Sequence, residues 1–201
     1  MPSDIFQTEK EQEVLRDECL LIQSFLEKGE IFGDLAEVGV YKGGSAKIIR
    51  EAIPNQPLHL FDTFIGLPDL MTGVDPKHYE VGHMKVEEEI PKELAKLPNT
   101  KVYKGQFSLM SGHINTRKFA FAHIDVDIYQ STKDALEFFY PRMEIGGSMI
   151  IHDYPAHPGV KKAVDEFMEG KGTKHLHKWR VWNKDPMIQS GFRQLIIRRR
   201  C

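Results

Sequence analysis

Acidic side chains follow three apolar runs of this sequence, at the point where each run ends. They are Asp62, Asp125 and Asp153, the last with His152 directly before it. A carboxylate is costly to bury unless it is paired or bound to a metal. A row of carboxylates at the ends of apolar segments therefore indicates a binding or catalytic site.

A further carboxylate, Asp127, lies two residues after Asp125 in the segment HIDVDIYQST, residues 123–132. Side chains two apart project to the same face of an extended chain, so these two carboxylates are expected to converge. Paired carboxylates can bind a hard cation, or one can act as a ligand and the other as a general base. Because a helical pattern begins at residue 131, a helix cap is the alternative interpretation of Asp127.

The segment that ends at His152 and Asp153 can complete such a site. If its strand neighbours the strand that ends at Asp125, the side chains at the two tips lie within coordination reach, because neighbouring strands are about 4.8 Å apart. Carboxylate oxygens, with an imidazole nitrogen in addition, suit Mg²⁺, Mn²⁺ or another divalent ion. The sequence therefore predicts a divalent metal site.

A glycine turn lies in AEVGVYKGGSA, residues 36–46. Its spacing differs from the GxGxxG pattern of dinucleotide-binding turns and from a Walker A loop. Glu37 places a negative charge beside this turn, which suits a cationic or amine-bearing ligand better than a phosphate. Asp62 stands where an acidic residue can accept both hydroxyls of a ribose. Together these residues favour a nucleoside ligand, with simple turn geometry as the alternative for the glycines.

The elements that position these residues follow from hydrophobic periodicity and from Gly and Pro punctuation. Helices are predicted over residues 8–26, 46–52, 86–97, 131–139 and 159–168. Strands are predicted over residues 35–40, 58–61, 101–104, 119–124, 147–151, 176–182 and 192–198. The alternation predicts an α/β fold with a mostly parallel sheet and helices on both faces, and the closing strand pair predicts one antiparallel edge strand at the C-terminus. Ligands of such sheets bind beyond the carboxyl ends of the strands.

One segment departs from this alternation. Residues 66–85 are interrupted by Gly and Pro and are too long for an ordinary connection, so we expect a lid or substrate loop there. Three histidines are candidates for the mouth of the pocket: His78, His83 and His157. Four aromatic residues are either pocket walls or core: Phe64, Tyr79, Tyr154 and Trp182.

Length and composition limit the classes of protein that remain. A chain of 201 residues with 41% hydrophobic and 28% charged residues fits one globular domain, residues 1–201, with an N-terminal helical segment over residues 1–30. The net charge of −2 offers no field for nucleic acid or an anionic membrane. Two cysteines and no leader-like or membrane-spanning pattern predict a cytoplasmic protein. Helix 8–26 either packs on its own domain or forms a homodimer.

Five motifs in register resemble one known family. They are AEVGVYKGG, FDTFIGLP at residues 61–68, HIDVDIYQST, GGSMIIHDY at residues 146–154 and GVKKAVDEF at residues 159–167. Together they resemble the TylF or macrocin O-methyltransferase family over about residues 34–170. The resemblance implies a Rossmann-like class I methyltransferase fold that uses S-adenosyl-L-methionine and a divalent metal.

The resemblance also implies roles for individual residues. It places Glu37, Gly39 and Gly43 at the methionine end of the cofactor, Asp62 at the ribose, and residues 105–107 near the adenine. The cofactor-binding set implied in full is Glu37, Gly39, Tyr41, Gly43, Ser45, Asp62, Thr63, Gln106, Phe107 and Asp125. Asp125, His152 and Asp153 match the metal ligands, Asp127 matches the general base, and Asp125 and Asp127 form the implied catalytic pair.

One residue departs from the family pattern. The family usually has Asp-Asp-Tyr where this chain has His152-Asp153-Tyr154. An imidazole ligand softens the site and either favours Mn²⁺, Fe²⁺ or Ni²⁺ over Mg²⁺ or leaves the metal site weaker. In the alternative interpretation His152 contacts the metal ligands without binding the metal itself, or it is an acid/base group.

These observations predict an S-adenosylmethionine-dependent, metal-assisted O-methyltransferase. Its partner is expected to be a small-molecule hydroxyl substrate, such as a sugar, a phenol or a vicinal diol. Two alternatives remain at this stage: a metal-dependent nucleotide-sugar glycosyltransferase, since Asp-Val-Asp after a strand can also hold Mn²⁺, and a non-catalytic nucleoside-binding module. The absence of basic residues set to meet a diphosphate near the glycine turn disfavours the glycosyltransferase.

Overall fold

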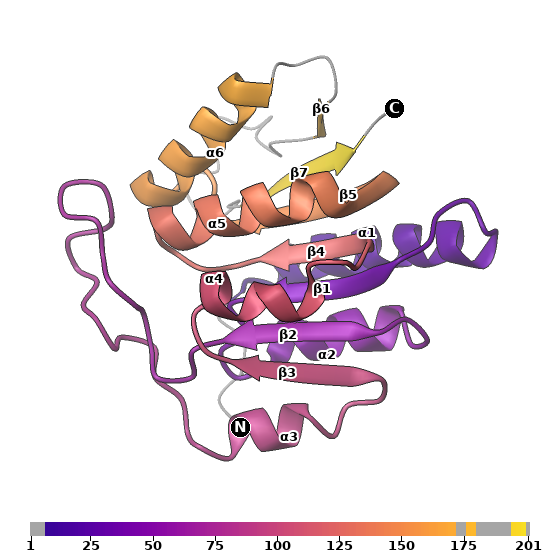
Figure 1. Cartoon of the computed structure of the whole chain (residues 1–201), viewed down its shortest axis with the longest axis horizontal. Coiled ribbons are helices and arrows are strands. Elements are labelled where there is room, and N and C mark those ends of the chain that lie inside the picture. Colours follow the sequence, from indigo (N-terminus) through magenta and orange to yellow (C-terminus); the bar gives the residue numbers. More distant parts are fainter. Residues whose placement is uncertain (1–6, 172–175, 180–193, 200–201) are drawn as a thin grey trace.

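A computed structural model describes residues 7–171, 176–179 and 194–199 of the chain. Figure 1 shows a single sheet with helices on both sides. The helices are α1 (Glu9–Glu27), α2 (Gly44–Ala52), α3 (Ile90–Leu94), α4 (Phe107–Met110), α5 (Tyr129–Phe139) and α6 (Pro158–Lys171). The strands are β1 (Asp34–Val38), β2 (Leu58–Asp62), β3 (Thr100–Lys104), β4 (Phe119–Ile124), β5 (Met143–His152), β6 (Leu176–Trp179) and β7 (Gln194–Arg199). Two 3₁₀ helices, η1 (Ser111–Ile114) and η2 (Tyr140–Arg142), complete the elements.

The described strands form one sheet in the order β3-β2-β1-β4-β5-β7-β6. The first five are mutually parallel, and β7 runs antiparallel to both β5 and β6. The predicted fold class is confirmed, with β6 lying outside the antiparallel β7. The strand order reverses between β1 and β4, which is where an open α/β sheet forms its ligand crevice.

Side-chain alternation along the strands divides the core into two layers. Leu35, Phe121 and Ile150 pack with Leu15 of α1 and Ile49 of α2 on one face. The strand residues between them pack against α4, α5 and α6 on the other face. By the same alternation, the side chains at positions 37, 123 and 152 belong to the α1 face. The polar end of that face therefore lies under the start of α1.

The start of α1 is fixed by a capping box. Thr8 Oγ1 accepts from the backbone N–H of Glu11 at 3.3 Å, and Glu11 Oε2 accepts from the backbone N–H of Thr8 at 2.8 Å. Further along, α1 buries Leu15, Cys19 and Ile22 completely. This helix therefore packs on its own domain, and a homodimer stays a prediction.

Most elements lie where hydrophobic periodicity predicts them, but the predicted bounds of one helix are wrong. A helix over 86–97 was expected, whereas α3 spans only Ile90–Leu94. Pro91 explains the late start of α3, because proline is tolerated in the first turn of a helix and breaks its interior. The connection after β3, for which no helix was predicted, contains α4 and η1, and β5 begins at Met143 instead of residue 147. Residues 180–182 of the predicted strand 176–182 lie outside the described residues.

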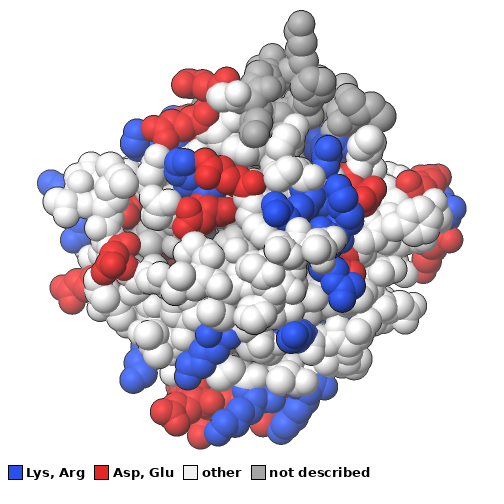
Figure 2. Space-filling model, in the orientation of Figure 1, with Lys and Arg blue, Asp and Glu red and all other residues white. Residues whose placement is uncertain are grey.

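Charged side chains are mixed on the surface that Figure 2 shows, where Lys and Arg lie among Asp and Glu and uncharged surface fills the middle of the view. Among the helices of the described ranges, none combines the length and the apolar composition needed to cross a membrane.

Candidate active site

A pocket of about 470 Å³ lies at the carboxyl ends of the parallel strands. Most of the site residues expected from the sequence line it: Gly39, Tyr41, Ser45, Asp62, Thr63, Gln106, Phe107, Asp125, Asp127, His152 and Asp153. Glu37 and Gly43 are the two expected residues that are not part of this lining. The sheet edge therefore gathers residues from four of the five motifs, together with Gln106 and Phe107, around one cavity.

The glycine turn after β1 packs directly against the end of β4. Gly39 has φ +85°, and a Cβ atom there would lie 1.7 Å from the carbonyl oxygen of Asp125. Only glycine permits this approach, because any side chain would overlap the backbone of the neighbouring strand. The turn and the first carboxylate of the acidic cluster are thus held in contact by a backbone requirement.

Asp62 fastens the same turn from β2. Its Oδ2 accepts from the backbone N–H groups of Val40 and Tyr41, both at 2.8 Å, and its Oδ1 accepts from the N–H of Phe64 at 2.7 Å. Burial raises the pKa of Asp62, and these hydrogen bonds oppose the rise. The carboxylate therefore shapes the turn as well as facing the pocket.

Glu37 and Gly43 support the turn from outside the cavity. Glu37 is fully buried, and its Oε1 forms a hydrogen bond of 2.8 Å with Nδ1 of His123. Burial raises its pKa. Gly43 lies against Leu94, whose Cδ2 would be 2.2 Å from a Cβ at this position. In this structure both residues reach the pocket only through their neighbours, which differs from the direct contact that the resemblance implies.

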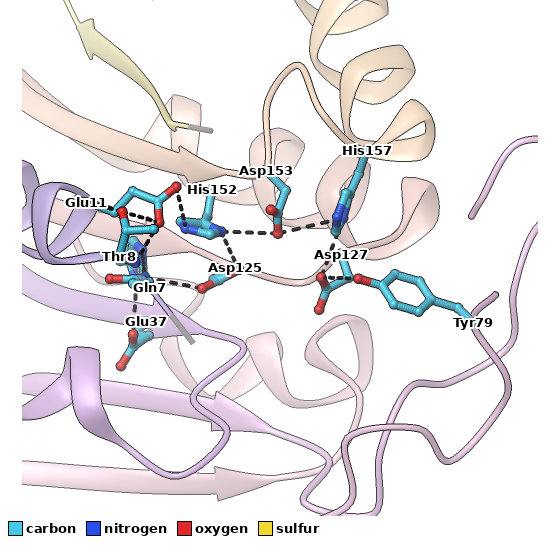
Figure 3. Close-up of polar contacts among 11 residues, drawn as sticks. Gln7, Thr8, Glu11, Glu37, Tyr79, Asp125, Asp127, His152, Asp153 and His157 are labelled. Atoms are coloured by element: carbon cyan, nitrogen blue, oxygen red, sulfur yellow. Dashed lines mark hydrogen bonds and ion pairs between the residues drawn. The ribbon is translucent and has the colours of Figure 1, made fainter. Parts of the chain in front are cut away.

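The acidic cluster forms because β4 and β5 are adjacent and parallel, with Ile124 opposite Ile151. Nδ1 of His152 lies 3.1 Å from Oδ1 of Asp125 and 3.1 Å from Oδ2 of Asp153 (Figure 3). These three residues offer donor atoms within 4.8 Å of one another, as a metal site requires. The predicted convergence of the two strand tips is therefore confirmed.

Charge at this cluster is balanced between the imidazole and the carboxylates. Burial disfavours the charged forms of Asp125 and His152. The charge and hydrogen bond of His152 nevertheless lower the pKa of Asp125 below its usual range. Against the effect of burial, Asp125, Asp153 and Glu11 raise the pKa of His152 well above its usual value. Without a metal, these contacts therefore favour a protonated imidazole beside an ionised Asp125.

Asp127 belongs to a second group on the pocket side of the cluster. Its Oδ1 accepts from the hydroxyl of Tyr79 at 2.9 Å and lies 3.5 Å from Nδ1 of His157, which is 3.6 Å from Oδ2 of Asp153. Asp127, Asp153 and His157 also have donor atoms within 4.8 Å of one another. Burial, then the charges of Asp125 and Asp153, raise the pKa of Asp127 to about 8.

The route by which Asp127 reaches the pocket differs from the predicted one. An extended segment was expected, but Asp127 has φ +63°, so the chain turns at this residue. The helix-cap alternative is not supported either, because the N-cap of α5 is Ile128 and it makes no side-chain cap. The N–H of Tyr129 is bonded instead by Asp75, at 2.7 Å.

Two residues of the N-terminal segment meet the cluster and carry no sequence signal for it. Nε2 of Gln7 donates to Oδ2 of Asp125 at 3.3 Å and lies 3.4 Å from Nε2 of His123. Oε1 of Glu11, a fully buried residue, lies 3.7 Å from Nε2 of His152. Burial raises the pKa of Glu11, but the interactions with His152 and Thr8 together lower it by more, so the net shift of its pKa is downward.

The predicted loop contributes one wall of the pocket. Residues 63–89 contain no helix or strand and project on the left of Figure 1. From this stretch Leu67, Pro68 and Tyr79 line the cavity, whereas His78 and His83 are exposed and contact the ring of Tyr79. Phe64 and Tyr154 are core residues, His157 lines the pocket, and Trp182 lies outside the described residues.

The geometry can now be compared with known proteins. The family model described as Macrocin-O-methyltransferase (TylF) matches residues 21–179. The chain belongs to this family. A curated relative, demethyldecarbamoylnovobiocin O-methyltransferase of Streptomyces niveus, is 30% identical over 155 residues, covering 67% of this chain and 58% of the relative. A second, 8-demethyl-8-(2,3-dimethoxy-alpha-L-rhamnosyl)-tetracenomycin-C 4'-O-methyltransferase of Streptomyces olivaceus, is 28% identical over 176 residues, covering 72% of this chain and 66% of that relative.

The chain of this TylF family member thus spans 58–66% of the length of these two relatives. Among solved structures, CalS11, a calicheamicin methyltransferase, superposes with a TM-score of 0.72 at 20% identity, covering 96% of this chain and 81% of that one. This likeness confirms the Rossmann-like methyltransferase fold.

Proposed function

We propose that this TylF family protein is an S-adenosylmethionine-dependent O-methyltransferase that acts on a small-molecule hydroxyl with the assistance of a divalent cation. The observation that carries the proposal is a single cavity, lined at one side by the glycine turn with Asp62 and at the other by Asp125, Asp127 and Asp153. A nucleoside-sized ligand and an acceptor can meet in it. The family and the two O-methyltransferase relatives support this assignment over a glycosyltransferase.

The cofactor is proposed to lie between the glycine turn and the start of α4. The methionine end faces Gly39, Tyr41 and Ser45, and the ribose faces Asp62 and Thr63. The adenine faces Gln106 and Phe107. Glu37 lies behind the turn, where it is bonded to His123, and Gly43 packs against Leu94, so neither is proposed to contact the cofactor.

The acidic cluster fits a divalent cation. For bonds of about 2.1 Å in octahedral coordination, adjacent donor atoms lie about 3 Å apart. Both donor pairs of His152, with Asp125 and with Asp153, are separated by 3.1 Å. Asp125, His152 and Asp153 would hold the ion, which when bound supplies Lewis-acid polarisation of the acceptor hydroxyl.

Asp127 is proposed as the general base of the transfer. It faces the same cavity as the metal ligands, and Tyr79 and His157 fix its orientation. Asp127 takes the hydroxyl proton while the acceptor oxygen forms a bond to the methyl carbon and the carbon–sulfur bond breaks. The products are a methyl ether and S-adenosylhomocysteine. The protein's own contribution is position and charge, which together lower the barrier of such a transfer.

The acceptor is proposed to be a hydroxyl of a sugar, with a phenol or another vicinal diol as related candidates. The Streptomyces olivaceus relative is named for a rhamnosyl compound, which supports a sugar. Tyr79, Leu67 and Pro68 of the loop form the wall beside Asp127 and would contact the acceptor.

Isothermal titration with S-adenosylhomocysteine tests the cofactor part. Wild-type protein should bind it, and Gln106→Ala should weaken binding about fivefold, as expected for one lost polar contact. Asn115→Ala, which removes an exposed amide side chain outside the pocket lining, serves as the matched control and should bind like wild type. Failure to bind S-adenosylhomocysteine and S-adenosylmethionine, with or without Mn²⁺, would overturn the assignment, and binding of a UDP-sugar instead would revive the glycosyltransferase.

Methyl transfer itself is tested by S-adenosylhomocysteine release with a panel of nucleotide sugars, free glycosides and catechols. We expect release with at least one acceptor, loss of that release with EDTA, and its return on adding a divalent ion. Cofactor binding without release for any acceptor would favour the non-catalytic module.

A further inference from the structure

A line of polar side chains runs through His152 from the interior to the pocket (Figure 3). On one side of the ring, Nδ1 faces the carboxylates of Asp125 and Asp153, each at 3.1 Å. On the other side, Nε2 faces Oε1 of Glu11 at 3.7 Å. The two nitrogens therefore have different surroundings, and each faces acceptor oxygens.

We propose that His152 is a metal ligand through Nδ1 and that Glu11 is the residue that positions its ring, so that the site binds nitrogen-accepting ions such as Mn²⁺ or Co²⁺ in preference to Mg²⁺. The inference rests on the proposed metal-assisted function. It concerns the place where this chain departs from the pattern of its family.

The first argument is the arrangement of the ring. A histidine that binds a metal through one nitrogen usually donates the proton on the other nitrogen to a carboxylate, which fixes the tautomer and the ring orientation. Glu11 stands where that second partner is needed. With the proton on Nε2, the lone pair of Nδ1 points toward the carboxylates of Asp125 and Asp153, where the ion would lie.

The second argument is how firmly Glu11 is held. Its Oε2 accepts from the backbone N–H of Thr8 at 2.8 Å and from the Thr8 hydroxyl at 2.9 Å. The capping box thus uses one carboxylate oxygen and turns the other toward Nε2 of His152. Glu11 is fully buried, and a buried carboxylate is stable only beside a partner of this kind.

The third argument is ligand chemistry. Mg²⁺ prefers oxygen ligands. Imidazole binds Co²⁺, Ni²⁺ and Zn²⁺ well, Mn²⁺ less well, and Mg²⁺ least well. Replacing one carboxylate by an imidazole also removes one negative charge from the ligand set. Both changes lower the affinity for Mg²⁺ more than the affinity for a transition metal.

Metal titration of the full chain tests the selectivity. We expect wild type to bind Co²⁺ and Mn²⁺ at least tenfold tighter than Mg²⁺ by isothermal titration, and His152→Asp to shift the ratio toward Mg²⁺ by at least tenfold. Spin-echo modulation of bound Mn²⁺ should show a coordinated nitrogen in wild type and in His157→Ala, but not in His152→Asp. A nitrogen signal that is lost in His157→Ala and kept in His152→Asp would overturn the proposal.

A double-mutant cycle tests Glu11. Glu11→Gln keeps a capping-box side chain, so its thermal unfolding should match that of Glu13→Gln, an exposed neighbour used as the control. We expect Glu11→Gln to weaken Co²⁺ binding about tenfold in wild type and to have no effect in His152→Asp, because there is no ring to orient. An equal loss in both backgrounds would mean a structural role and would overturn the positioning role.

The outcome also separates this inference from the proposed function. If no metal binds wild type while S-adenosylhomocysteine binds and methyl transfer proceeds in EDTA, the ligand role of His152 is overturned and the methyltransferase stands. If metal binds as expected but S-adenosylhomocysteine does not, the proposed function fails and the metal site stands.

Discussion

The Oδ1 atom of Asp75 accepts a hydrogen bond from the backbone N–H of Tyr129 at 2.7 Å. Its Oδ2 accepts from the N–H of Met71, also at 2.7 Å, and the residue is buried. A side chain from the middle of loop 63–89 therefore occupies the place of a cap for α5. The loop that walls the pocket is tied to the helix that follows Asp127.

Replacing Asp75 with Ala removes both bonds and leaves a buried N–H without its partner. We expect a loss of about 1–2 kcal/mol in the free energy of unfolding in urea, together with faster proteolysis within residues 63–89. Glu80→Ala, an exposed acidic change in the same loop, is the control and should change stability by less than about 0.5 kcal/mol. Equal stability of the two variants would contradict the capping role.

Gly39 and Gly73 have similar backbone conformations but differ in the space available for a side chain. Gly39 has φ +85° and Gly73 has φ +81°, but a Cβ at Gly39 would lie 1.7 Å from the carbonyl oxygen of Asp125, whereas a Cβ at Gly73 meets nothing within 4 Å. We expect Gly73→Ala to cost about 1 kcal/mol and Gly39→Ala to cost more than about 4 kcal/mol or to abolish soluble expression. Urea unfolding and soluble yield are the measurements. Similar costs would show that the turn can move away from β4.

Cys19 is expected to be chemically inert in the folded protein. It is fully buried in α1, and burial, with the charges of Glu18 and Glu37, raises the pKa of its thiol well above the usual value. Because the thiolate is the nucleophile, the native chain should leave Cys19 unlabelled by iodoacetamide, as read by peptide mass spectrometry. The same peptide in urea is the positive control. Rapid native labelling would indicate that α1 opens from the sheet.

The sequence is sufficient to predict the sheet edge but not the end of α1 that covers it. Strand tips at Asp62, Asp125 and His152 follow from apolar runs, and parallel packing brings their ends together. In the structure, strand register and side-chain alternation place residues 37, 123 and 152 on one face of the sheet. Nothing local shows that Gln7 and Glu11 reach that face, because their place depends on how α1 packs against α2 and the sheet.

Asp127 shows a second limit of sequence patterns. Its presence beside Asp125 was predicted, but from an extended chain, whereas the backbone enters the left-handed region at φ +63°. The contacts that hold it there come from Tyr79 in the loop and His157 before α6, far away in the sequence. Patterns among residues close in the sequence cannot locate partners that are so far away along the chain. The hydrogen bond between Asp75 and Tyr129 could not be predicted for the same reason.

The roles of Asp127 and Tyr79 are separable by two matched variants. Asp127→Asn keeps an acceptor for the Tyr79 hydroxyl but cannot take a proton, so kcat should fall by about 10²–10⁴, while the Kd for S-adenosylhomocysteine changes less than about twofold. Tyr79→Phe removes one hydrogen bond to Asp127 and leaves the carboxylate in place, so kcat should fall by only about 2–10-fold. Single-turnover methyl transfer measures both. Equal losses would mean that Tyr79 takes part in the proton transfer directly, and an active Asp127→Asn would show that another group is the base.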